Sequence, residues 1–439
     1  MQETIDIKKY NSFVETNSFV KKTGKISRVI GLMIESNGPG VAIGSICAIR
    51  SRTRSEVRAQ VVGFRNNQTL LMPLDDIHGI EPGCIIEATE EQPSFGVCSE
   101  MIGRVLDGNG KPIDGKGPIP LGTEYPLMGT PTNPLNRVRV NQSLDVGVRS
   151  INGLLTCAKG QRIGIMAGTG LGKSILLGMI ARNTEAEVNV IALIGERGRE
   201  VKEFIDENLG PEGLKRSIVI AAASDQPPLV RLRGAFIAMT IAEYFRDQEK
   251  DVLLMMDSIT RFALAQREIG LSVGEPPTTK GYPPSTFSLI PKLLERAGTS
   301  EGNGTITGLY TVLVEGDDIN EPVSDAVRAV LDGHIVLDRE LAAHNHYPAI
   351  DILSSVSRLM IDVISKEHYN LSMELKDLLA TYNEAKDLIN IGAYAKGSNT
   401  KWDTAIDKID RINAYLKQGI METVTMGESL KALKEIVEG

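Results

Sequence analysis

A loop rich in glycine, followed directly by a lysine and a serine, is the stretch of the sequence whose residue types and spacing indicate chemistry most directly. The apolar residues 163–166 lead into this loop, and apolar residues at helical spacing follow it. Glycines let consecutive backbone N–H groups turn inward as a nest for an anion, and the N-terminus of the next helix adds partial positive charge. A loop of this kind cradles the phosphates of a nucleoside triphosphate. The residues expected to bind it are Gly168, Thr169, Gly170, Leu171, Gly172, Lys173, Ser174 and Ile175.

Two side chains give this loop its chemistry. Lys173 is expected to reach the β- and γ-phosphates, and the hydroxyl of Ser174 is expected to coordinate Mg²⁺. Ala167 stands where such loops usually carry glycine, and its small side chain should be tolerated there. An ordinary glycine-rich turn is the alternative, but the Lys–Ser pair, the strand before the loop and the helix after it favour a P-loop. ATP and Mg²⁺ are therefore the predicted ligands.

Carboxylates follow two other apolar runs of the sequence. The apolar residues 252–256 are followed directly by Asp257. This is the pattern of a strand whose terminal aspartate holds Mg²⁺ through a coordinating water. Glu196 follows the apolar residues 188–194 and stands beside two arginines, where it can orient or polarise an attacking water. Either carboxylate alone also fits a helix cap or a turn. After a P-loop, the pair predicts a hydrolytic site in which Ser174 and Asp257 hold the metal.

The elements that must position these residues alternate between strands and helices. Several runs are apolar along their whole length, as in strands buried on both faces, and helical patterns at 229–245 and 259–269 lie between them. This alternation is typical of a parallel α/β sheet, and ligands of such sheets bind at the carboxyl ends of the strands. The predicted strands are 163–166, 188–196, 217–224, 251–258 and 305–316.

The composition excludes several classes of function. The 439 residues are 42% hydrophobic and 24% charged, which is typical of a globular protein with a large core. The sequence contains neither a run of about 18 apolar residues nor a signal-peptide core, so we expect a cytosolic protein without a membrane span. A net charge of −8 and an aromatic content of 5% argue against a nucleic-acid-binding protein. Buried free thiols, with no zinc site, are predicted for Cys47, Cys84, Cys98 and Cys157.

The regions on either side of the predicted sheet differ from it in pattern. Residues 1–23 carry apolar residues at roughly helical spacing, which fits either a partner-binding amphipathic helix or a frayed terminus. Residues 24–95 alternate short β-branched runs with turn signals and predict a small antiparallel β-barrel with a structural or oligomer-forming role. Residues 100–160 are dominated by glycine- and proline-rich loops and predict a connector. Residues 361–439 predict a C-terminal helical domain.

Four long motifs carry a family resemblance. They are GERGREV (195–201), MDSITRFALAQREIGL (256–271), GEPPTTKGYPPSTFSLIPKLLERAG (274–298) and VEGDDINEPVSDAVRAVLDGHIVLDRELAAHNHYPAIDILSSVSRLM (314–360). Together they resemble the rotary-type ATPase family, and most closely its protein-export branch, the ATPases of flagellar export and of type III secretion injectisomes. The resemblance covers about residues 24–395. It implies an N-terminal β-barrel, a RecA-like P-loop core over residues 96–360 and a C-terminal helical domain.

The same resemblance implies roles for individual residues. Glu196 matches the catalytic glutamate of the family, and Arg197 matches an arginine near the γ-phosphate. Arg358 matches the arginine finger that a neighbouring subunit inserts into the site; its chemistry alone would make it a surface residue that forms salt bridges. Tyr347 matches an aromatic residue that packs against the adenine ring. A finger supplied by a neighbour requires a ring, so the resemblance implies a homohexamer.

The function that the resemblance implies is Mg²⁺-dependent ATP hydrolysis that energises flagellar type III protein export. The implied location is the cytoplasm, at the inner face of the membrane beside the export apparatus. The implied partners are a stator-like regulator at the N-terminal residues, a coiled-coil stalk protein, the membrane export gate, and export substrates with their chaperones on the C-terminal domain. No nucleic-acid partner is expected.

Three other functions, from more than one class, stay open at this point. An injectisome ATPase shares nearly all the motifs. The catalytic subunit of an F- or V-type synthase would carry an acidic DELSEED-like sequence in its C-terminal domain, and none is found. A Rho-like RNA translocase would need a barrel with basic and aromatic residues; the barrel has few rings, although it carries Arg50, Arg52, Arg54, Arg58 and Arg65.

Overall fold

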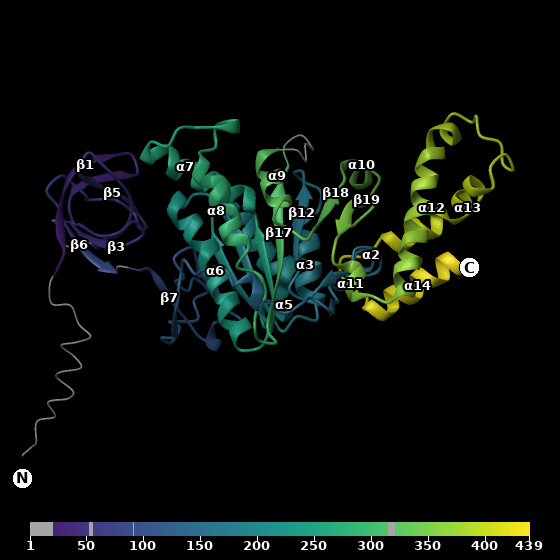
Figure 1. The fold of residues 1–439 in the computed structure, drawn as a ribbon, viewed down its shortest axis with the longest axis horizontal. Helices are drawn as coiled ribbons and strands as arrows, with labels where there is room; N and C mark the ends of the chain where they lie inside the picture. Colours follow the sequence, from purple (N-terminus) through teal and green to yellow (C-terminus); the bar gives the residue numbers. More distant parts are fainter. Residues whose placement is uncertain (1–20, 52–55, 91, 315–320) are drawn as a thin grey trace, which may run out of the picture. The chain divides into compact units, whose positions relative to one another are not determined.

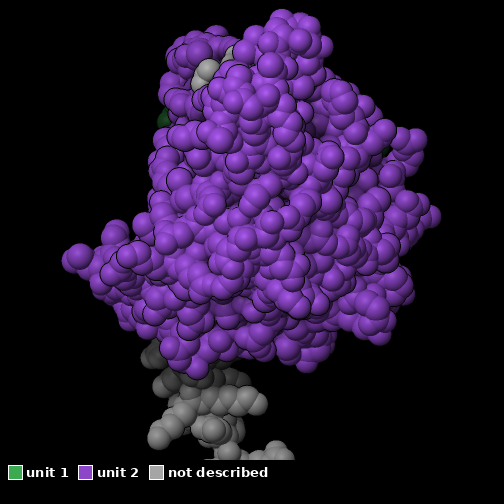
Figure 2. Space-filling view, turned by 90° about the vertical axis from the view of Figure 1, so that its right-hand side faces the viewer, with its two compact units in different colours: residues 1–94, 272–274 green, residues 95–271, 275–439 purple. Residues whose placement is uncertain are grey.

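The structure is a computed structural model that describes most of the chain, namely residues 21–51, 56–90, 92–314 and 321–439. The chain divides into two compact units, residues 1–94 with 272–274 and residues 95–271 with 275–439, which Figure 2 colours separately. The predictions for the N-terminal residues 1–20 and for Arg52 and Arg54 lie outside the described residues. No helix in the part of the chain that the structure describes is long and apolar enough to cross a membrane.

The first unit contains a closed antiparallel barrel, as predicted from its alternating sequence. Neighbouring strands pair in the order β1-β2-β5-β4-β3-β6, and β6 returns to β1 to close the barrel. Residues such as Ile34, Cys47, Ile49 and Leu71 fill the interior and are fully buried. Full closure leaves no exposed sheet edge. The strands are β1 (Thr23–Ile30), β2 (Met33–Asn37), β3 (Ile46–Arg50), β4 (Glu56–Arg65), β5 (Gln68–Pro73) and β6 (Ile85–Glu90).

The second unit is built around a large, mostly parallel sheet, which confirms the predicted α/β class. The strand order is β19-β18-β12-β17-β15-β13-β14-β8, with only the edge strand β19 antiparallel to its neighbour among these described strands. A short strand, β16 (Gly298–Thr299), pairs with β17 outside this path. The strands are β8 (Val105–Asp107), β12 (Arg162–Ala167), β13 (Val188–Ile194), β14 (Ser217–Ala222), β15 (Asp251–Asp257), β17 (Thr305–Leu313), β18 (Gly333–Leu337) and β19 (Ile350–Ser357).

Helices cover both faces of this sheet, which explains why its strands are apolar along their whole length. Ile191 and Leu193 of β13 belong to the core cluster that also contains α3, while Val190 and Ala192, which alternate with them, are buried just as fully. Helix α6 packs on β13, β14 and β15. Figure 1 shows these helices flanking the central strands. The helices of the core are α2 (Arg149–Leu154), α3 (Lys173–Asn183), α4 (Gly198–Glu203), α5 (Gly210–Leu214), α6 (Pro228–Asp247), α7 (Ile259–Val273), α8 (Pro284–Leu294), α9 (Pro322–Arg328), α10 (Arg339–Ala343) and α11 (Met360–Val363).

The connector predicted for residues 100–160 is more structured than its glycine and proline content suggests. β8 adds a parallel edge strand beside β14, and α2 contributes Ile151 and Leu154 to the main core. Two small two-stranded sheets occur among the described residues around this region. Their strands are β7 (Ser94–Val97) with β9 (Thr123–Pro126), and β10 (Ser143–Leu144) with β11 (Cys157–Ala158).

The C-terminal residues form helices, as predicted, and these helices share the core of the second unit. Leu375, Ile412 and Leu433 are fully buried in the same cluster as the sheet strands. Side chains cap each helix: Ser365, Asn399 and Thr425 accept hydrogen bonds from backbone N–H groups of the first turn. The boundary between residues 360 and 361 stays a prediction. The helices are α12 (Lys366–Asn390), α13 (Thr400–Leu416) and α14 (Met426–Glu438).

Candidate active site

The glycine-rich loop connects β12 to α3, the strand–loop–helix arrangement expected of a P-loop. Gly170 and Gly172 have φ angles of +82° and +83°, which an L side chain rarely adopts. Gly172 is also the N-cap of α3, so the free N–H groups of the first helical turn lie at the loop. Leu171, one of the residues expected to bind nucleotide, places its side chain in the hydrophobic core. The predicted loop residues whose atoms line a cavity are Gly168, Thr169, Gly170, Gly172, Lys173, Ser174 and Ile175.

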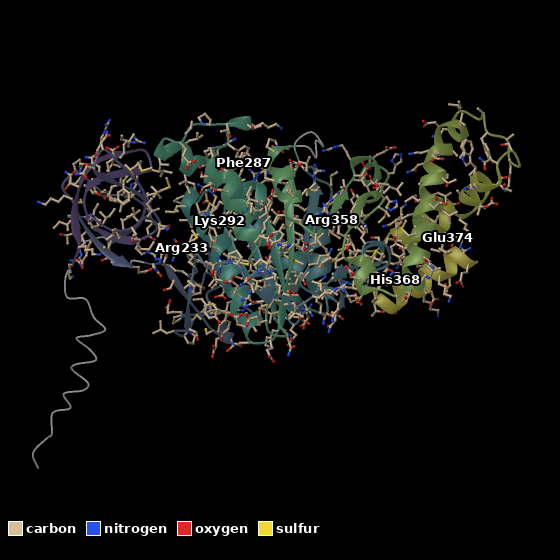
Figure 3. All side chains as sticks on the ribbon, viewed as in Figure 1. Arg233, Phe287, Lys292, Arg358, His368 and Glu374 are labelled. Atoms are coloured by element: carbon tan, nitrogen blue, oxygen red, sulfur yellow. The ribbon has the colours of Figure 1, made fainter. Side chains whose placement is uncertain are left out.

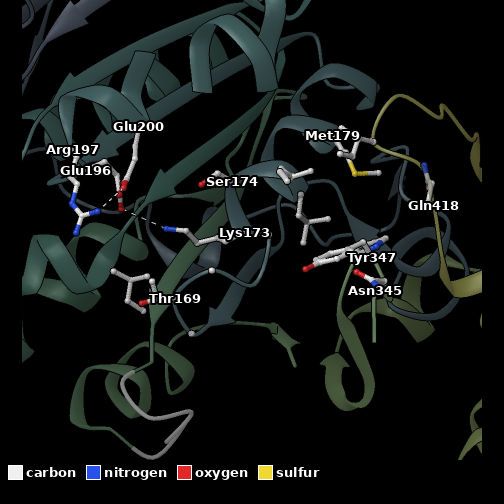
Figure 4. A pocket seen from close by; sticks show the side chains of 18 of the residues that line it. Thr169, Lys173, Ser174, Met179, Glu196, Arg197, Glu200, Asn345, Tyr347 and Gln418 are labelled. Atoms are coloured by element: carbon white, nitrogen blue, oxygen red, sulfur yellow. Dashed lines mark hydrogen bonds and ion pairs between the residues drawn. The ribbon is translucent and has the colours of Figure 1, made fainter. Parts of the chain in front are cut away.

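Lys173, Glu196 and Asp257 meet at the carboxyl edge of the sheet. The Nζ of Lys173 forms an ion pair with Oδ1 of Asp257 and lies 3.6 Å from Oε1 of Glu196, toward which it points in Figure 4. Asp257 is 3% exposed, and its Oδ1 also accepts a 2.7 Å hydrogen bond from Oγ1 of Thr311. In the sheet, the strands run in the order β12, β17, β15, β13. Lys173 comes after β12, Asp257 ends β15 and Glu196 follows β13, so three segments far apart in sequence bring these groups together.

Burial and neighbouring charges set the protonation of this group. Burial and the negative charge of Asp257 raise the pKa of Glu196 to about 7, although Lys173 opposes the shift. Burial, the largest influence on Lys173, lowers its pKa, but Asp257 and Glu196 together raise that pKa above the ordinary lysine value. The ammonium of Lys173 is therefore charged at neutral pH. A glutamate that titrates near neutrality is suited to accept a proton from water.

The oxygen groups present fit Mg²⁺ bound together with a nucleotide. Ser174 places a hydroxyl on the cavity wall, and Asp257 places a carboxylate in an ion pair with Lys173. Within the described residues, no cluster of three His, Cys, Asp or Glu side chains could hold a metal alone. Mg²⁺ is commonly held by one or two protein oxygens, with phosphates and waters completing its coordination. The buried Oε1 of Glu196 accepts no hydrogen bond from a described residue.

A cavity of about 1200 Å³ joins this polar group to an apolar end. Figure 4 shows Lys173, Ser174 and Glu196 at one end, and Met179, Tyr347 and Gln418 at the other. The ring of Tyr347, the predicted adenine contact, lies over the loop: two of its atoms are 3.5 Å from the position that a Cβ on Gly172 would take. The polar end of such a cavity suits the phosphates of a nucleotide, and the apolar, aromatic end suits its flat base.

Sequence reasoning missed the C-terminal contribution to the apolar end. The segment 417–420, between α13 and α14, lines the cavity beside Tyr347. Gln418 is held in place because its Oε1 accepts from the Arg149 N–H at 2.7 Å, its Nε2 donates to the Gly147 carbonyl at 2.9 Å, and its backbone N–H donates to the Tyr347 carbonyl at 3.0 Å. Nothing in the local sequence signals that this loop reaches the nucleotide cavity.

Two arginines line the phosphate end, and only one of them was predicted. Arg197 lines the cavity, with its side chain 77% exposed and its Nη1 3.2 Å from Oε1 of Glu200. Arg261, which sequence reasoning missed, stands in the first turn of α7 with its stem against Gly195. Its buried Nε has no hydrogen-bond partner among the described residues, and the side chain brings a further positive charge to the cavity wall. Its position four residues after Asp257 is the signal that could have indicated it.

Arg358 does not reach this cavity within its own chain. It follows β19 and lines a separate small pocket with residues of α12. Arg358, which Figure 3 labels, donates from its backbone N–H to the Asp332 carbonyl at 3.0 Å. Its side chain is exposed, and its Nη1 donates to the Leu331 carbonyl at 3.4 Å. An arginine in this position can serve a nucleotide site only if that site belongs to another copy of the chain. The role of a finger in trans stays a prediction.

The fold and the site together define a P-loop ATPase with a RecA-like core. Three family models match consecutive parts of the chain. The "ATP synthase alpha/beta family, beta-barrel domain" matches residues 26–90, and the "ATP synthase alpha/beta family, nucleotide-binding domain" matches residues 147–357. The "T3SS EscN ATPase C-terminal domain" matches residues 364–435.

Individual relatives resemble the chain over nearly its whole length. The "Flagellum-specific ATP synthase" of Bacillus subtilis is 52% identical over 96% of this chain and 97% of its own. The assembled ATPase EscN from the type III secretion system of enteropathogenic E. coli is 43% identical, with a TM-score of 0.90 over 94% of this chain and all of that one. EscN in complex with its central stalk EscO has a TM-score of 0.88 at 42% identity, with the same coverage. The chain belongs to the ATP synthase α/β family, in the branch of flagellum-specific and type III secretion ATPases, and it is an ATPase.

The pKa of Glu196 predicts how hydrolysis depends on pH. Because the pKa of the Glu196 carboxyl is raised to about 7, the protonated form, which cannot accept a proton, grows as the pH falls below neutrality. We therefore expect kcat/KM for ATP to rise from about pH 6 to about pH 8, with an apparent pKa near 7. Steady-state rates across this range, at constant ionic strength and Mg²⁺, measure it. A profile that is flat from about pH 6 upward would show that Glu196 titrates like an ordinary carboxyl.

Proposed function

We propose that the chain hydrolyses MgATP as a homohexameric ring and that the hydrolysis energises flagellar type III protein export. The observation that carries the hydrolytic part is the meeting of Lys173, Glu196 and Asp257 beside a cavity that fits a nucleotide. The flagellar assignment is supported by the relatives: the flagellum-specific one is 52% identical, while the EscN chain is 43% identical.

Each residue has a defined task in the proposed reaction. The loop's backbone N–H groups bind the phosphates, and Lys173 neutralises charge that develops on the β- and γ-phosphates. Ser174 and, through water, Asp257 hold Mg²⁺, which supplies positive charge to the phosphate oxygens. Glu196 accepts the proton of the attacking water, and Arg197 lies near the γ-phosphate.

The remaining parts of the site bind the base and complete the ring. Tyr347 and the segment 417–420 enclose the adenine at the apolar end. Arg358 of one copy reaches the γ-phosphate held by the next copy, because it stands outside its own nucleotide cavity. Catalysis then requires assembly. The "assembled" state in which EscN was solved supports this requirement.

Location and partners follow from the same proposal. The ring works in the cytoplasm, at the inner face of the membrane. Its partners are a stator-like regulator at the N-terminal residues, a coiled-coil stalk in the centre of the ring, the export gate, and chaperone-bound substrates on the C-terminal helices. The central stalk EscO bound to EscN supports the stalk protein. The N-terminal contact falls on residues outside the described part of the chain.

Capture of partners from the native cell tests the export assignment. Cross-linking of living cells that carry a tagged copy, followed by mass spectrometry, is expected to recover flagellar rod or hook subunits and their chaperones. Needle or translocator proteins in their place would keep the export function and assign it to an injectisome. Recovery of synthase rotor subunits would contradict export altogether. Strong stimulation of hydrolysis by RNA would favour a Rho-like translocase.

A further inference from the structure

A second, smaller pocket of about 240 Å³ surrounds Arg358. One wall is the end of β19 and the residues that follow it, and the other is one face of α12. The α12 residues stand three, four and seven positions apart, so they project from the same side of the helix. The polar residues that line the pocket are Ser355, Ser357, Arg358, Tyr369, Ser372 and Lys376.

This pocket carries two positive charges and no negative one. Arg358 and Lys376 both line it, and no carboxylate does. The nearby Asp362 is paired with Arg139 at 3.0 Å. Across the described stretches of the chain, neither cation forms an ion pair with an acidic side chain. His334 is close enough for the charge of Arg358 to add to burial and to Arg328 in lowering its pKa, so it supplies no further charge at neutral pH.

Lys376 is the unexpected member of this pair. It is partly buried, and burial lowers its pKa. Even partial burial of a cation without a counter-charge is unfavourable. Unpaired charge beside a pocket indicates a functional anion site better than it indicates a structural contact. The missing negative charge therefore comes from outside this copy of the chain.

The rim of the pocket indicates where the anion comes from. Val356, Ile361 and Met373 are 44%, 60% and 47% exposed, so apolar surface surrounds the two cations. Apolar residues around a charged centre are typical of a protein–protein contact that excludes water. In the proposed function, the nucleotide cavity of a second copy of this chain holds a triphosphate. Its charge complements that of the pocket.

We propose that Lys376 is a positioning residue for Arg358 at the site that two copies share. Both residues line one pocket, so the charge of Lys376 disfavours entry of the Arg358 guanidinium into it. The 3.4 Å hydrogen bond from Arg358 Nη1 to the Leu331 carbonyl then gives way to the triphosphate of the adjacent copy. The inference rests on the proposed function, in which Arg358 acts in trans. It adds Lys376 of α12 as a residue that affects hydrolysis only by positioning Arg358.

The experiment compares ATP hydrolysis by assembled rings of four variants. Lys376→Met keeps the aliphatic stem and removes the charge, and we expect kcat to fall about tenfold with little change in KM. Lys376→Arg should restore most of the rate. Arg358→Ala should be nearly inactive, and adding Lys376→Met to it should cost nothing further, because the lysine acts through the arginine. If Lys376→Met lowered kcat by the same factor in the wild-type chain and in the Arg358→Ala chain, the inference would be overturned.

Mixed rings separate action in trans from action within one chain. Copies carrying Lys173→Ala have an inactive site of their own but an intact Arg358 and Lys376. Mixed with Lys376→Met copies, they should raise the rate per Lys376→Met copy toward the wild-type value. No increase would overturn the inference. A lower melting temperature or loss of the ring in Lys376→Met alone would likewise make the residue merely structural.

The outcomes also separate this inference from the proposed function. If Arg358→Ala rings hydrolyse ATP normally, the trans finger fails and the proposed reaction fails with it. If Arg358→Ala is inactive while Lys376→Met behaves as wild type, only the role of Lys376 fails. If Lys376→Met hydrolyses ATP normally but no longer binds an acidic partner peptide, the pocket recognises a protein partner and the inference is wrong.

Discussion

Replacing Glu196 with glutamine should lower ATP turnover by about 10³-fold and leave ATP binding nearly unchanged. The amide has the size of the carboxyl but cannot accept the proton of the attacking water. The contacts that bind phosphate are kept, because Lys173 still pairs with Asp257 and the loop geometry does not depend on Glu196. The change therefore separates binding from chemistry.

Two measurements on the assembled ring test this expectation. The dissociation constant of a fluorescent ATP analogue should stay within a few-fold of the wild-type value, while the steady-state rate of phosphate release falls. Glu203→Gln is the matched control, since Glu203 is an exposed carboxylate of α4, two turns from Glu196, that does not line the cavity. Hydrolysis near the wild-type rate in Glu196→Gln would remove Glu196 from its proposed role.

The phosphate end of the site could be predicted from sequence because parallel sheets impose a rule on it. The carboxyl ends of parallel strands share one edge, so a P-loop after one strand, Asp257 at the end of a second and Glu196 after a third had to meet. The apolar runs that mark these strands are long and buried on both faces, which makes them easy to recognise. The elevated pKa of Glu196 was not predictable, since it comes from its burial and its approach to Asp257.

The base end and the edges of the sheet depend on long-range packing and escaped prediction. β8 lies in a glycine- and proline-rich stretch and is only three residues long, but it pairs with β14, more than a hundred residues later. The segment 417–420 reaches Tyr347 because α12, α13 and α14 pack on the main core. Arg261 was overlooked although it stands one helical turn after Asp257. Such contacts are set by tertiary structure, and local patterns do not report them.

Replacing Arg358 with alanine should remove nearly all hydrolysis by the assembled ring, by about 10³-fold or more. In the proposed reaction the guanidinium stabilises negative charge on the transferred phosphate. Among the described residues that line its pocket, Lys376 is the one other cation. ATP binding by a single copy should be unaffected, because Arg358 does not line its own nucleotide cavity. Rates measured across protein concentration, with the oligomeric state followed by analytical ultracentrifugation, check the prediction.

The dependence of activity on protein concentration distinguishes action in trans from action within one chain, which the loss of activity alone does not. Wild-type activity per chain should rise steeply as rings form, whereas Arg358→Ala should stay flat even when it assembles equally well. Lys366→Ala is the matched control: it removes an exposed cation from the first turn of α12, outside the pocket, and should behave as wild type. A wild-type monomer as active as the ring, and equally impaired by Arg358→Ala, would place the arginine in the site of its own chain. Because Arg358 stands outside its own nucleotide cavity, we expect activity to depend on a second copy.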